Sequence, residues 1–560
     1  RLHWDAVRPF GVSTASHLLE EEAMKGTALP FELGLFRFPR LFLDYLSQRL
    51  PPELSSLRLL DAGRLGNLGK PGDGSPGKRL WDEVLEYNLR IGAGEGAAGA
   101  IRALASGDAT AICTGQQPGL FGGPLYTLYK TATAVSLSEE LSRRSGRTFV
   151  PVFWSAADDS DFAEVSRADF FASDLSSRRF AVRDDAHTTG LMVGAMSTAA
   201  LLPAVDQLMR EFGGLEGSAY LDGCIEDAIS VSQDWGEFVS SLLIRLLRPS
   251  DLVVVDSRLG SVQERSRRVV GTYLERREQA RSEIDTTLRR LETGGYALPV
   301  TQRSAEVCLF VKEGGRRRKL LREELKSVSE RWEKGEVELL PNVLLGPVVR
   351  DDVLGSAANV VGPSEICYYV VASAIYRALD LTQAPVVPRL SQTIVPESVV
   401  SALGLEPEAL SSVVTSFDAV VSERAGRSVP PDVARELALF GDEVDSGFGR
   451  VERVAPSLGR SLEEVAASSR RRVESEVRRV RGEFLAAARK RLLAESPVLR
   501  RAREFVCPGG DLQERGYCCL SPVVHKGERF VGQVRETAAS HVSRCLEGRF
   551  YHHIVTMDIP

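Results

Sequence analysis

AICTGQQPGLFGGPLYTLYK, residues 111–130, is the stretch that sets the expected fold. It opens with a short apolar run, continues through two glutamines and three glycines, and ends in apolar residues at helical spacing. This pattern predicts a strand, a tight glycine-rich loop and a helix. In a parallel sheet such a loop lies at the carboxyl end of the strand, where free helix N–H groups can approach a phosphate or carboxylate. We therefore expect a ligand beside this loop.

The glycine spacing of the loop matches neither the dinucleotide fingerprint G-x-G-x-x-G nor the P-loop G-x-x-x-x-G-K-[ST]. The glycines could therefore simply close a strand-to-helix turn. The glutamines favour a ligand, because Gln116 and Gln117 offer amide donors and carbonyl acceptors beside the loop. Both interpretations stay open at the level of the sequence.

The composition is that of a globular protein with several folding units. A chain of 560 residues is too long for one core, and its net charge of −6 is small for a surface that binds nucleic acid. No apolar run approaches the roughly 20 residues that span a bilayer, and the first residues lack the apolar region of a signal peptide. We expect a cytoplasmic protein with neither nucleic-acid nor membrane partners.

The eight cysteines are scattered through the chain. Their spacing predicts buried free thiols in a reducing compartment rather than a disulfide framework. Cys507, Cys518, Cys519 and His525 could be imagined as zinc ligands, but no C-x-x-C pair supports such a site. We expect no zinc.

A second buried strand is expected at 148–154, and an acidic cluster follows it. Strand, helix and strand form one βαβ unit, whose right-handed crossover places both strand ends at the same edge of the sheet. The cluster of Asp158, Asp159 and Asp161 should therefore face the glycine-rich loop. Three carboxylates could bind Mg²⁺, hold an ammonium group or act as a general base. Alternatively, they form an acidic turn that caps the next helix.

Weaker signals fill the next part of the chain. Residues 170–250 are expected to form an insertion, after which a third buried strand, LVVVD, brings Asp256 to the same sheet edge. One long charged helix is expected over about 261–291. The basic run at 316–319 reads as a turn, which is most often a solvated face and less often a phosphate contact.

Residues 341–391 are the second informative stretch. The turn Gly362-Pro363, followed by Glu365 and an apolar helix, predicts another loop that opens a helix. The helix dipole stabilises a Glu in the first turn, so Glu365 could be either a cap or a catalytic residue. A short strand then delivers a cation and two hydroxyls, which suit a phosphate, although the cation could equally form a structural ion pair. These residues are Arg389, Ser391 and Thr393.

From residue 401 the composition shifts to Arg, Glu, Ala and Leu, and apolar residues over 473–487 repeat with the heptad rhythm of a coiled coil. A single helix over 462–505 would be about 65 Å long. It must pair, either with 409–437 in an antiparallel hairpin or across a dimer axis. The chain then returns through a glycine turn and the run 512–515 to a strand-like end, HHIVTMDIP.

Five blocks occur in an order that carries a family resemblance. They are TGQQPGLFGGPLYTLYK, PVFWSAADDSDFAEV, GPVVRDDVLGSAANVVGPSEICYY, VPRLSQT and GGDLQER, with a long helix before the last. Together they resemble the cysteine ligases of bacillithiol biosynthesis, the BshC family, over nearly the whole chain. The resemblance implies an α/β fold, with a Rossmann-like parallel-sheet core, connecting-peptide insertions and an α-helical coiled-coil domain used in dimerisation.

The resemblance also divides the chain. The expected segments are a first part of the core at 1–169, a connecting insertion at 170–250, a second part of the core at 251–395 with a helical insertion at about 261–291, the coiled-coil domain at 396–505 and a C-terminal return to the core at 506–560. The pocket is expected where the two glycine-rich loops and the acidic cluster meet.

The implied reaction joins the carboxyl group of L-cysteine to the amine of glucosaminyl malate, the last step to bacillithiol. Amide formation from a free carboxylate is uphill in water, so an activated cysteine is expected. ATP is the suspected activator and Mg²⁺ could accompany it, although no standard ATP motif is present. The expected partners are these small molecules and a second copy of the chain. Alternatives are an ATP-dependent ligase for another amino-sugar conjugate and a non-catalytic nucleotide-binding coiled-coil dimer.

The expected site residues come from the family's blocks and from the strand ends described above, among them Asp256. The expected catalytic residues are Gln116, Gln117, Lys130, Asp158, Asp159 and Asp161. The expected substrate- or nucleotide-binding residues are Thr114, Gly115, Gly122, Gly123, Tyr126, Asp256, Gly362, Pro363, Glu365, Arg389, Ser391, Gln513, Glu514 and Arg515. In this hypothesis the carboxylates hold the amine or a metal, the glutamines orient a carboxylate, and Lys130 or Arg389 offsets developing negative charge.

Two blocks depart from the family pattern. The acidic block usually reads E-D-H-D-F, but this chain has Ser160 in place of the histidine, and a serine hydroxyl cannot titrate near neutral pH. In the block G-G-P-x-E, Val361 replaces the first glycine. These differences concern the substrate or the activity rather than the fold.

Overall fold

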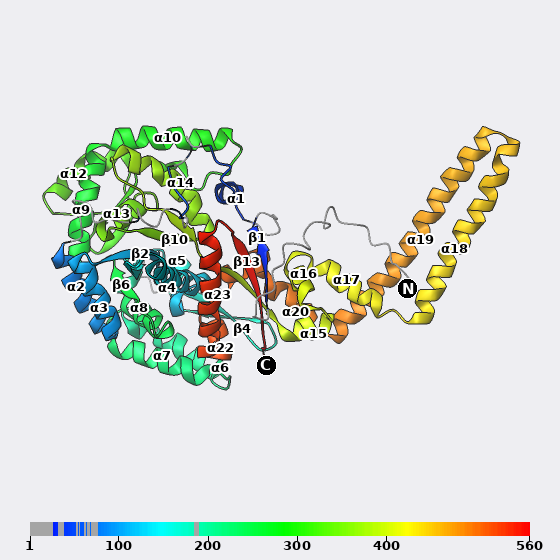
Figure 1. Cartoon of the computed structure of the whole chain (residues 1–560), viewed down its shortest axis with the longest axis horizontal. Coiled ribbons are helices and arrows are strands. Elements are labelled where there is room, and N and C mark those ends of the chain that lie inside the picture. The colour runs from blue at the N-terminus through cyan, green and yellow to red at the C-terminus, as the bar shows by residue number, and fades with distance from the viewer. Residues whose placement is uncertain are drawn as a thin grey trace.

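A computed structural model describes residues 26–31, 38–51, 54, 56–60, 63, 68, 77–183 and 190–559. A rounded body carries a long helical arm on one side (Figure 1). Among the described residues, no helix is long and apolar enough to cross a membrane.

The centre of the body is a five-stranded sheet with the order β11-β10-β2-β3-β6, in which every neighbouring pair is parallel. Its interior strands are almost wholly apolar and buried, as expected for a parallel sheet covered by helices on both faces. The predicted Rossmann-like sheet is confirmed. Its strands are β2 (Ala109–Gln116), β3 (Thr148–Ser155), β6 (Val253–Asp256), β10 (Ala358–Val361) and β11 (Val386–Pro388).

The direction in which the chain crosses this sheet reverses beside β2. From β2 the chain passes through β3 to β6 on one side, and it later places β10 and β11 on the other side. All five strands end at one edge because they are parallel. The loops after β2 and β10 leave that edge in opposite directions, which opens the crevice where ligands bind in open α/β sheets.

Helix α4 (Leu125–Ser145) is the central helix of the body. It ends at Gly146, whose φ of 71° allows the left-handed turn that closes a helix. It packs against β2 and β3 on one side and against α23 (Glu528–Leu546) on another, so most of its side chains are buried. The other helices around the sheet are α1 (Arg40–Leu46), α2 (Lys78–Arg90), α3 (Glu95–Ser106), α13 (Gly346–Leu354) and α14 (Pro363–Ala378).

The segment between β3 and β6 forms one short helix, a small antiparallel ribbon and three longer helices, and the longer helices lie below the sheet in Figure 1. Asp234 caps its last helix by accepting the backbone N–H of Glu237. Its elements are α5 (Phe162–Val165), β4 (Arg167–Phe171), β5 (Ser177–Ala181), α6 (Leu202–Phe212), α7 (Ser218–Val231) and α8 (Trp235–Leu246).

The segment between β6 and α13 contains two corrections. The single helix expected over 261–291 is wrong, because the backbone leaves the helix at Arg276, which lets the second half pack on α14. The basic turn expected at 316–319 is also wrong, because Gly314-Gly315 makes the turn and the basic run forms a strand. The elements are α9 (Gly260–Glu275), α10 (Arg277–Thr293), α11 (Gln302–Glu306), β7 (Leu309–Glu313), β8 (Arg316–Lys319), α12 (Leu325–Glu333) and β9 (Glu338–Pro341).

A second sheet joins the two ends of the described chain. Its order is β1-β13-β12, with β1 (Gly26–Pro30), β12 (Ser391–Pro396) and β13 (Tyr551–Met557). The short helices α21 (Gln513–Gly516) and α22 (Ser521–Lys526) lead back to it from the arm. Of the eight described cysteines, seven are buried, whereas Cys507 is exposed and the prediction of burial is wrong there.

The arm is an antiparallel hairpin of α18 and α19 (Figure 1). A single helix over 462–505 is wrong, because the backbone leaves the helix at Ser496 and the next residue, Pro497, cannot donate a helical hydrogen bond. The hairpin partner of α19 was expected at 409–437, but the helix that packs most extensively on α19 is α18, which lies largely beyond that range. Helix α17, inside the expected range, also packs on α19. The helices are α15 (Glu397–Leu403), α16 (Leu410–Thr415), α17 (Phe417–Arg427), α18 (Pro431–Val454), α19 (Arg460–Glu495) and α20 (Pro497–Val506).

We predict that Leu128→Ala destabilises the body by about 2–5 kcal/mol, because Leu128 is fully buried in α4 and its loss leaves a cavity. The matched control is Leu89→Ala in α2, where the side chain is 47% exposed and little should change. Chemical denaturation followed by circular dichroism measures both. Equal losses would contradict the central position of α4.

Candidate active site

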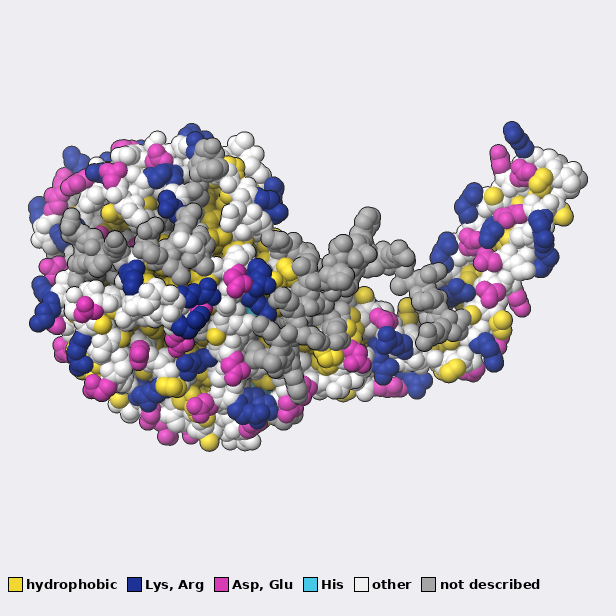
Figure 2. Space-filling view, in the orientation of Figure 1, with side chains coloured by type: hydrophobic (Ala, Val, Ile, Leu, Met, Phe, Trp, Pro, Cys, Tyr) yellow, Lys and Arg dark blue, Asp and Glu magenta, His cyan; other side chains and the backbone are white. Residues whose placement is uncertain are grey.

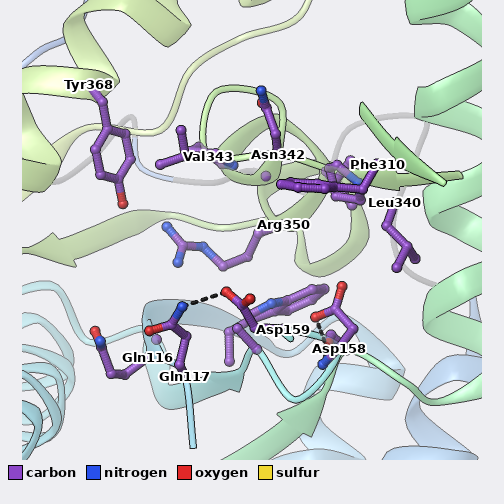
Figure 3. A pocket seen from close by; sticks show the side chains of 18 of the residues that line it. Gln116, Gln117, Asp158, Asp159, Phe310, Leu340, Asn342, Val343, Arg350 and Tyr368 are labelled. Atoms are coloured by element: carbon purple, nitrogen blue, oxygen red, sulfur yellow. Dashed lines mark hydrogen bonds between the residues drawn. The ribbon is translucent and has the colours of Figure 1, made fainter. Parts of the chain in front are cut away.

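A cavity of about 820 Å³ lies at the carboxyl edge of the parallel sheet. The loops after β2, β3 and β10 line one side of it, and the three-stranded sheet β8-β7-β9 lines the other. Figure 3 shows this arrangement, with Gln117 and Asp159 facing Phe310 and Asn342 across the space. The cavity therefore lies where the strand order reverses.

The two glutamines after β2 have different partners. Gln117 donates its amide to Asp159, which also forms an ion pair with Arg317 of β8 at 2.9 Å. Gln116 donates to the hydroxyl of Tyr126 at 3.2 Å. Asp159 thus joins the strand ends to the overlying sheet β8-β7-β9.

The three aspartates of the acidic cluster point to different partners. Asp158 accepts a hydrogen bond from the hydroxyl of Ser257 at 2.6 Å. Asp161 accepts the backbone N–H of Glu164 at 3.1 Å and so caps α5, which is the capping alternative. Within the described ranges, no three His, Cys, Asp or Glu side chains are placed to hold a metal ion. The three carboxylates all line the cavity but do not converge.

A buried ion pair connects the two glycine-containing loops. Lys130 of α4 lies 2.7 Å from Glu365, and only 1% of the lysine side chain is exposed. Lys130 also donates to the carbonyl of Gly115 at 2.8 Å. Glu365 accepts the backbone N–H of Gly362 at 2.6 Å, so it caps α14 and binds the lysine at once.

Burial and pairing act in opposite directions on the pKa values of these two groups. Burial lowers the pKa of Lys130, and the neighbouring Glu365 opposes that shift. Burial acts to raise the pKa of Glu365, but Lys130 and the Gly362 N–H outweigh it, so the pKa lies below its usual value. A buried pair of this kind costs stability when one partner is removed, because the other charge is left unpaired.

Arg389 enters the cavity from the end of β11. Its guanidinium lies over the ring of Tyr126 and forms an ion pair with Glu514 at 2.6 Å. Glu514 is completely buried and also accepts hydrogen bonds from the hydroxyl of Ser391. The C-terminal segment therefore fixes a cation that lines the cavity.

Seven of the predicted binding residues lie behind the cavity wall rather than in it. The hydroxyl of Thr114 donates to the carbonyl of Val360, and Gln513 binds the backbone around Ile394. Gly122 and Gly123 of the first loop form its turn, because both have positive φ. A Cβ on Gly122 would also lie 2.7 Å from the sulfur of Cys519. Placement in the cavity is therefore corrected for Thr114, Gly122, Gly123, Asp256, Ser391, Gln513 and Glu514.

Asp256 ends β6 at the expected edge but faces away from the cavity. It forms an ion pair with Arg258 at 2.7 Å, and Arg258 also pairs with Asp234 at 2.8 Å. Burial raises the pKa of Asp256, although Arg258 opposes this shift. Its carboxylate thus holds the neighbouring insertion against the sheet.

The structure brings the remaining predicted residues together around the cavity. These are Gly115, Gln116, Gln117, Tyr126, Lys130, Asp158, Asp159, Asp161, Gly362, Pro363, Glu365, Arg389 and Arg515. Several lining residues were not predicted. Some come from the segment that forms the sheet β8-β7-β9, whose position over the sheet edge has no signal in the sequence, and the others lie on α5, α13 and α14, where helix packing decides which side chains reach the cavity. The main ones are Glu164, Phe310, Arg317, Trp332, Asn342, Arg350 and Tyr368.

Comparison with known proteins gives the family. Residues 70–390 match the model described as "Bacillithiol biosynthesis BshC, N-terminal Rossmann-like domain". These residues include all five strands of the parallel sheet and every strand-end loop that lines the cavity.

Curated relatives extend the match over most of the chain. A protein of Solibacter usitatus is 30% identical over 436 residues, which cover 75% of this chain and 81% of the relative. A protein of Koribacter versatilis is 28% identical, with 85% of this chain and 91% of the relative covered. Both carry the name "Putative cysteine ligase BshC". The chain therefore belongs to the BshC family of bacillithiol biosynthesis.

Proposed function

We propose that this chain forms the amide bond between the carboxyl group of L-cysteine and the amine of glucosaminyl malate. The observation that carries the proposal is one cavity that is lined both by the carboxylates following β3 and by the buried cations Lys130 and Arg389. The family supplies the context of bacillithiol biosynthesis, and the names of the relatives supply a cysteine ligase. The identity of the amine substrate and the activation of the cysteine carboxylate are our inference.

The acidic part of the cavity suits the amine substrate. An ammonium group must lose a proton before its nitrogen can attack a carboxyl carbon, and a carboxylate with a raised pKa can accept that proton. Partial burial and the neighbouring Asp161 and Asp159 raise the pKa of Glu164, which lines the cavity. We propose Glu164 as the general base, with Asp159 holding the amine.

Ser160 does not line the cavity, and its backbone N–H donates to Asp159 at 2.6 Å. The site therefore relies on carboxylates for proton transfer where the family pattern has a histidine. Glu164 lies close enough to Asp159 for the two charges to interact, which places a titratable group beside the proposed amine position.

The cationic part of the cavity suits an activated carboxyl group. Lys130 and Arg389 are held in place by acidic partners, so they can stabilise developing negative charge without reorganisation. ATP would supply the activation of the cysteine carboxylate, and the first turn of α14, where Gly362 and Ser364 line the cavity, would hold its phosphates. A cavity of about 820 Å³ has room for more than one small molecule.

We also propose that two copies associate through the arm. Figure 2 shows apolar side chains exposed along the arm. An apolar stripe on a long exposed hairpin is typical of a helix-pairing surface. The exposed residues are Leu439, Phe440, Val451, Val454, Leu462, Val465 and Phe484.

The proposed reaction can be tested in a bacterium that accumulates glucosaminyl malate because its own cysteine-adding enzyme is deleted. Expression of this chain should produce bacillithiol, measured by thiol labelling and mass spectrometry. Continued accumulation of glucosaminyl malate with folded protein present would contradict the proposed acceptor.

For Glu164→Gln we expect kcat to fall by about 10²–10⁴-fold, because a neutral amide cannot accept the proton. Wild-type activity should rise with pH through the raised pKa of Glu164, since the base works only when deprotonated, and this rise should vanish in the variant. Glu139→Gln, on the exposed side of α4, is the control and should keep wild-type kinetics. An unchanged pH profile in Glu164→Gln would exclude Glu164 as the base.

Charges placed on the arm should separate the proposed dimer. We expect Phe440→Glu with Val465→Glu to shift the mass measured by sedimentation from two chains to one, since each charge would be buried at the interface. Leu89→Glu on the body, at a side chain of similar exposure, should leave the mass unchanged. A wild-type protein that sediments as one chain at micromolar concentration would refute the dimer.

A further inference from the structure

We propose that Arg350 is the anion-binding residue of the cavity and takes a substrate carboxylate. The inference rests on the proposed function for the identity of the substrates, but the contacts that carry it belong to the protein alone. It assigns a role to a residue that was not among those predicted from the sequence.

Four cations with nearly buried side chains line the cavity in the part of the chain that the structure describes. Three of them have acidic partners: Lys130 pairs with Glu365, Arg317 with Asp159, and Arg389 with Glu514. Their distances are 2.7, 2.9 and 2.6 Å respectively. Arg350 is only 8% exposed, yet no carboxylate among the described residues lies within ion-pair distance of it.

The contacts of Arg350 leave most of its donors unused. One terminal nitrogen donates to the hydroxyl of Tyr369, and the buried Nε has no hydrogen-bond partner. A guanidinium carries five N–H donors, so the side chain is far from satisfied. The other terminal nitrogen would lie 3.3 Å from a Cβ on Gly115, so the guanidinium rests against the glycine at the end of β2.

The nearest acidic groups are already engaged. Both oxygens of Glu365 accept hydrogen bonds, from Lys130 and the Gly362 N–H on one side and from Tyr368 on the other. Asp351, the next residue in α13, accepts hydrogen bonds from Asn359 and Tyr376. Among the described residues, neither Glu365 nor Asp351 is free to pair with Arg350, so we infer that a bound anion is its partner.

The direction of the side chain points to that partner. Figure 3 shows the Arg350 guanidinium projecting into the space between Tyr368 and the two glutamines. A buried charge without a partner is costly, and the cost is recovered when an anion binds. A planar guanidinium binds a carboxylate through two parallel hydrogen bonds, which also fixes its orientation.

Among the described residues, Arg350 is the one nearly buried cation of the cavity without an acidic partner, and a single carboxylate would complete it. A triphosphate carries several negative charges and would need several free cations. The other buried cations of the cavity already neutralise acids of the protein, so a carboxylate suits Arg350 better. Two sources of a carboxylate exist in the proposed reaction, namely the malyl group of the amine substrate and L-cysteine. The experiment must separate them.

The test compares ligand pairs that differ in the carboxylate, by calorimetry on wild type and Arg350→Gln. The pairs are glucosaminyl malate with methyl glucosaminide, and L-cysteine with cysteamine. We expect Arg350→Gln to weaken one carboxylate-bearing ligand by about 10- to 100-fold and to leave its carboxylate-free counterpart unchanged. The ligand pair whose affinities diverge in Arg350→Gln identifies the source of the carboxylate. The affinity of Arg350→Lys should lie between those of wild type and Arg350→Gln, because lysine offers a point charge but not the two parallel donors of a guanidinium.

The matched control is Arg268→Gln, which removes an exposed arginine of α9 that pairs with Asp352 of α13, the helix that carries Arg350. This variant should bind all ligands as wild type does. Melting of Arg350→Gln should stay within a few degrees of wild type or rise, because no ion pair is lost. A large fall in melting temperature would instead make Arg350 structural and overturn the proposal.

L-malate and ATP, each titrated alone, complete the design. If wild type binds L-malate but not glucosaminyl malate, and Arg350→Gln loses L-malate, the proposed function fails while the role of Arg350 stands. If no carboxylate ligand responds to Arg350→Gln, or if only ATP does, the assignment of a carboxylate to Arg350 is wrong.

Discussion

The parallel pairing of β2 with both β3 and β10 is the constraint on which the site depends. Because neighbouring strands run in the same direction, each loop that follows a strand emerges at the same edge of the sheet. The strands themselves are apolar and buried, so polar chemistry is confined to that edge. Gln117, Asp159 and Glu365 are far apart in the sequence, yet they line one cavity for this reason.

Charge pairing then decides which of these groups remain available to a ligand. A lone buried charge is costly, and most of the buried cations that line the cavity have an acid within hydrogen-bond distance. One of these acids, Glu514, comes from the C-terminal segment after the helical arm. The end of the chain is thus part of the wall that holds Arg389, although it follows the arm in sequence.

The overlying sheet β8-β7-β9 gives the cavity its second wall and ties it to the acidic cluster. Arg317 of β8 pairs with Asp159 and also donates to the backbone carbonyl of Asp158. The acidic loop is therefore held from above as well as from the strand that precedes it. In our proposal this fixed loop, with Glu164 at its end, takes over proton transfer in a chain that has Ser160 where the family pattern has histidine.

The sequence by itself determined the parallel sheet, the strand-end loops and the family, because apolar runs, glycine turns and ordered blocks are local signals. It could not show that the Gly122 turn faces Cys519, that Asp256 pairs with Arg258, or that long helices break at Arg276 and Ser496, since packing partners decide these points. It could not single out Arg350 either. Whether an acid lies beside a buried arginine depends on how distant segments pack, and the tertiary structure alone decides this.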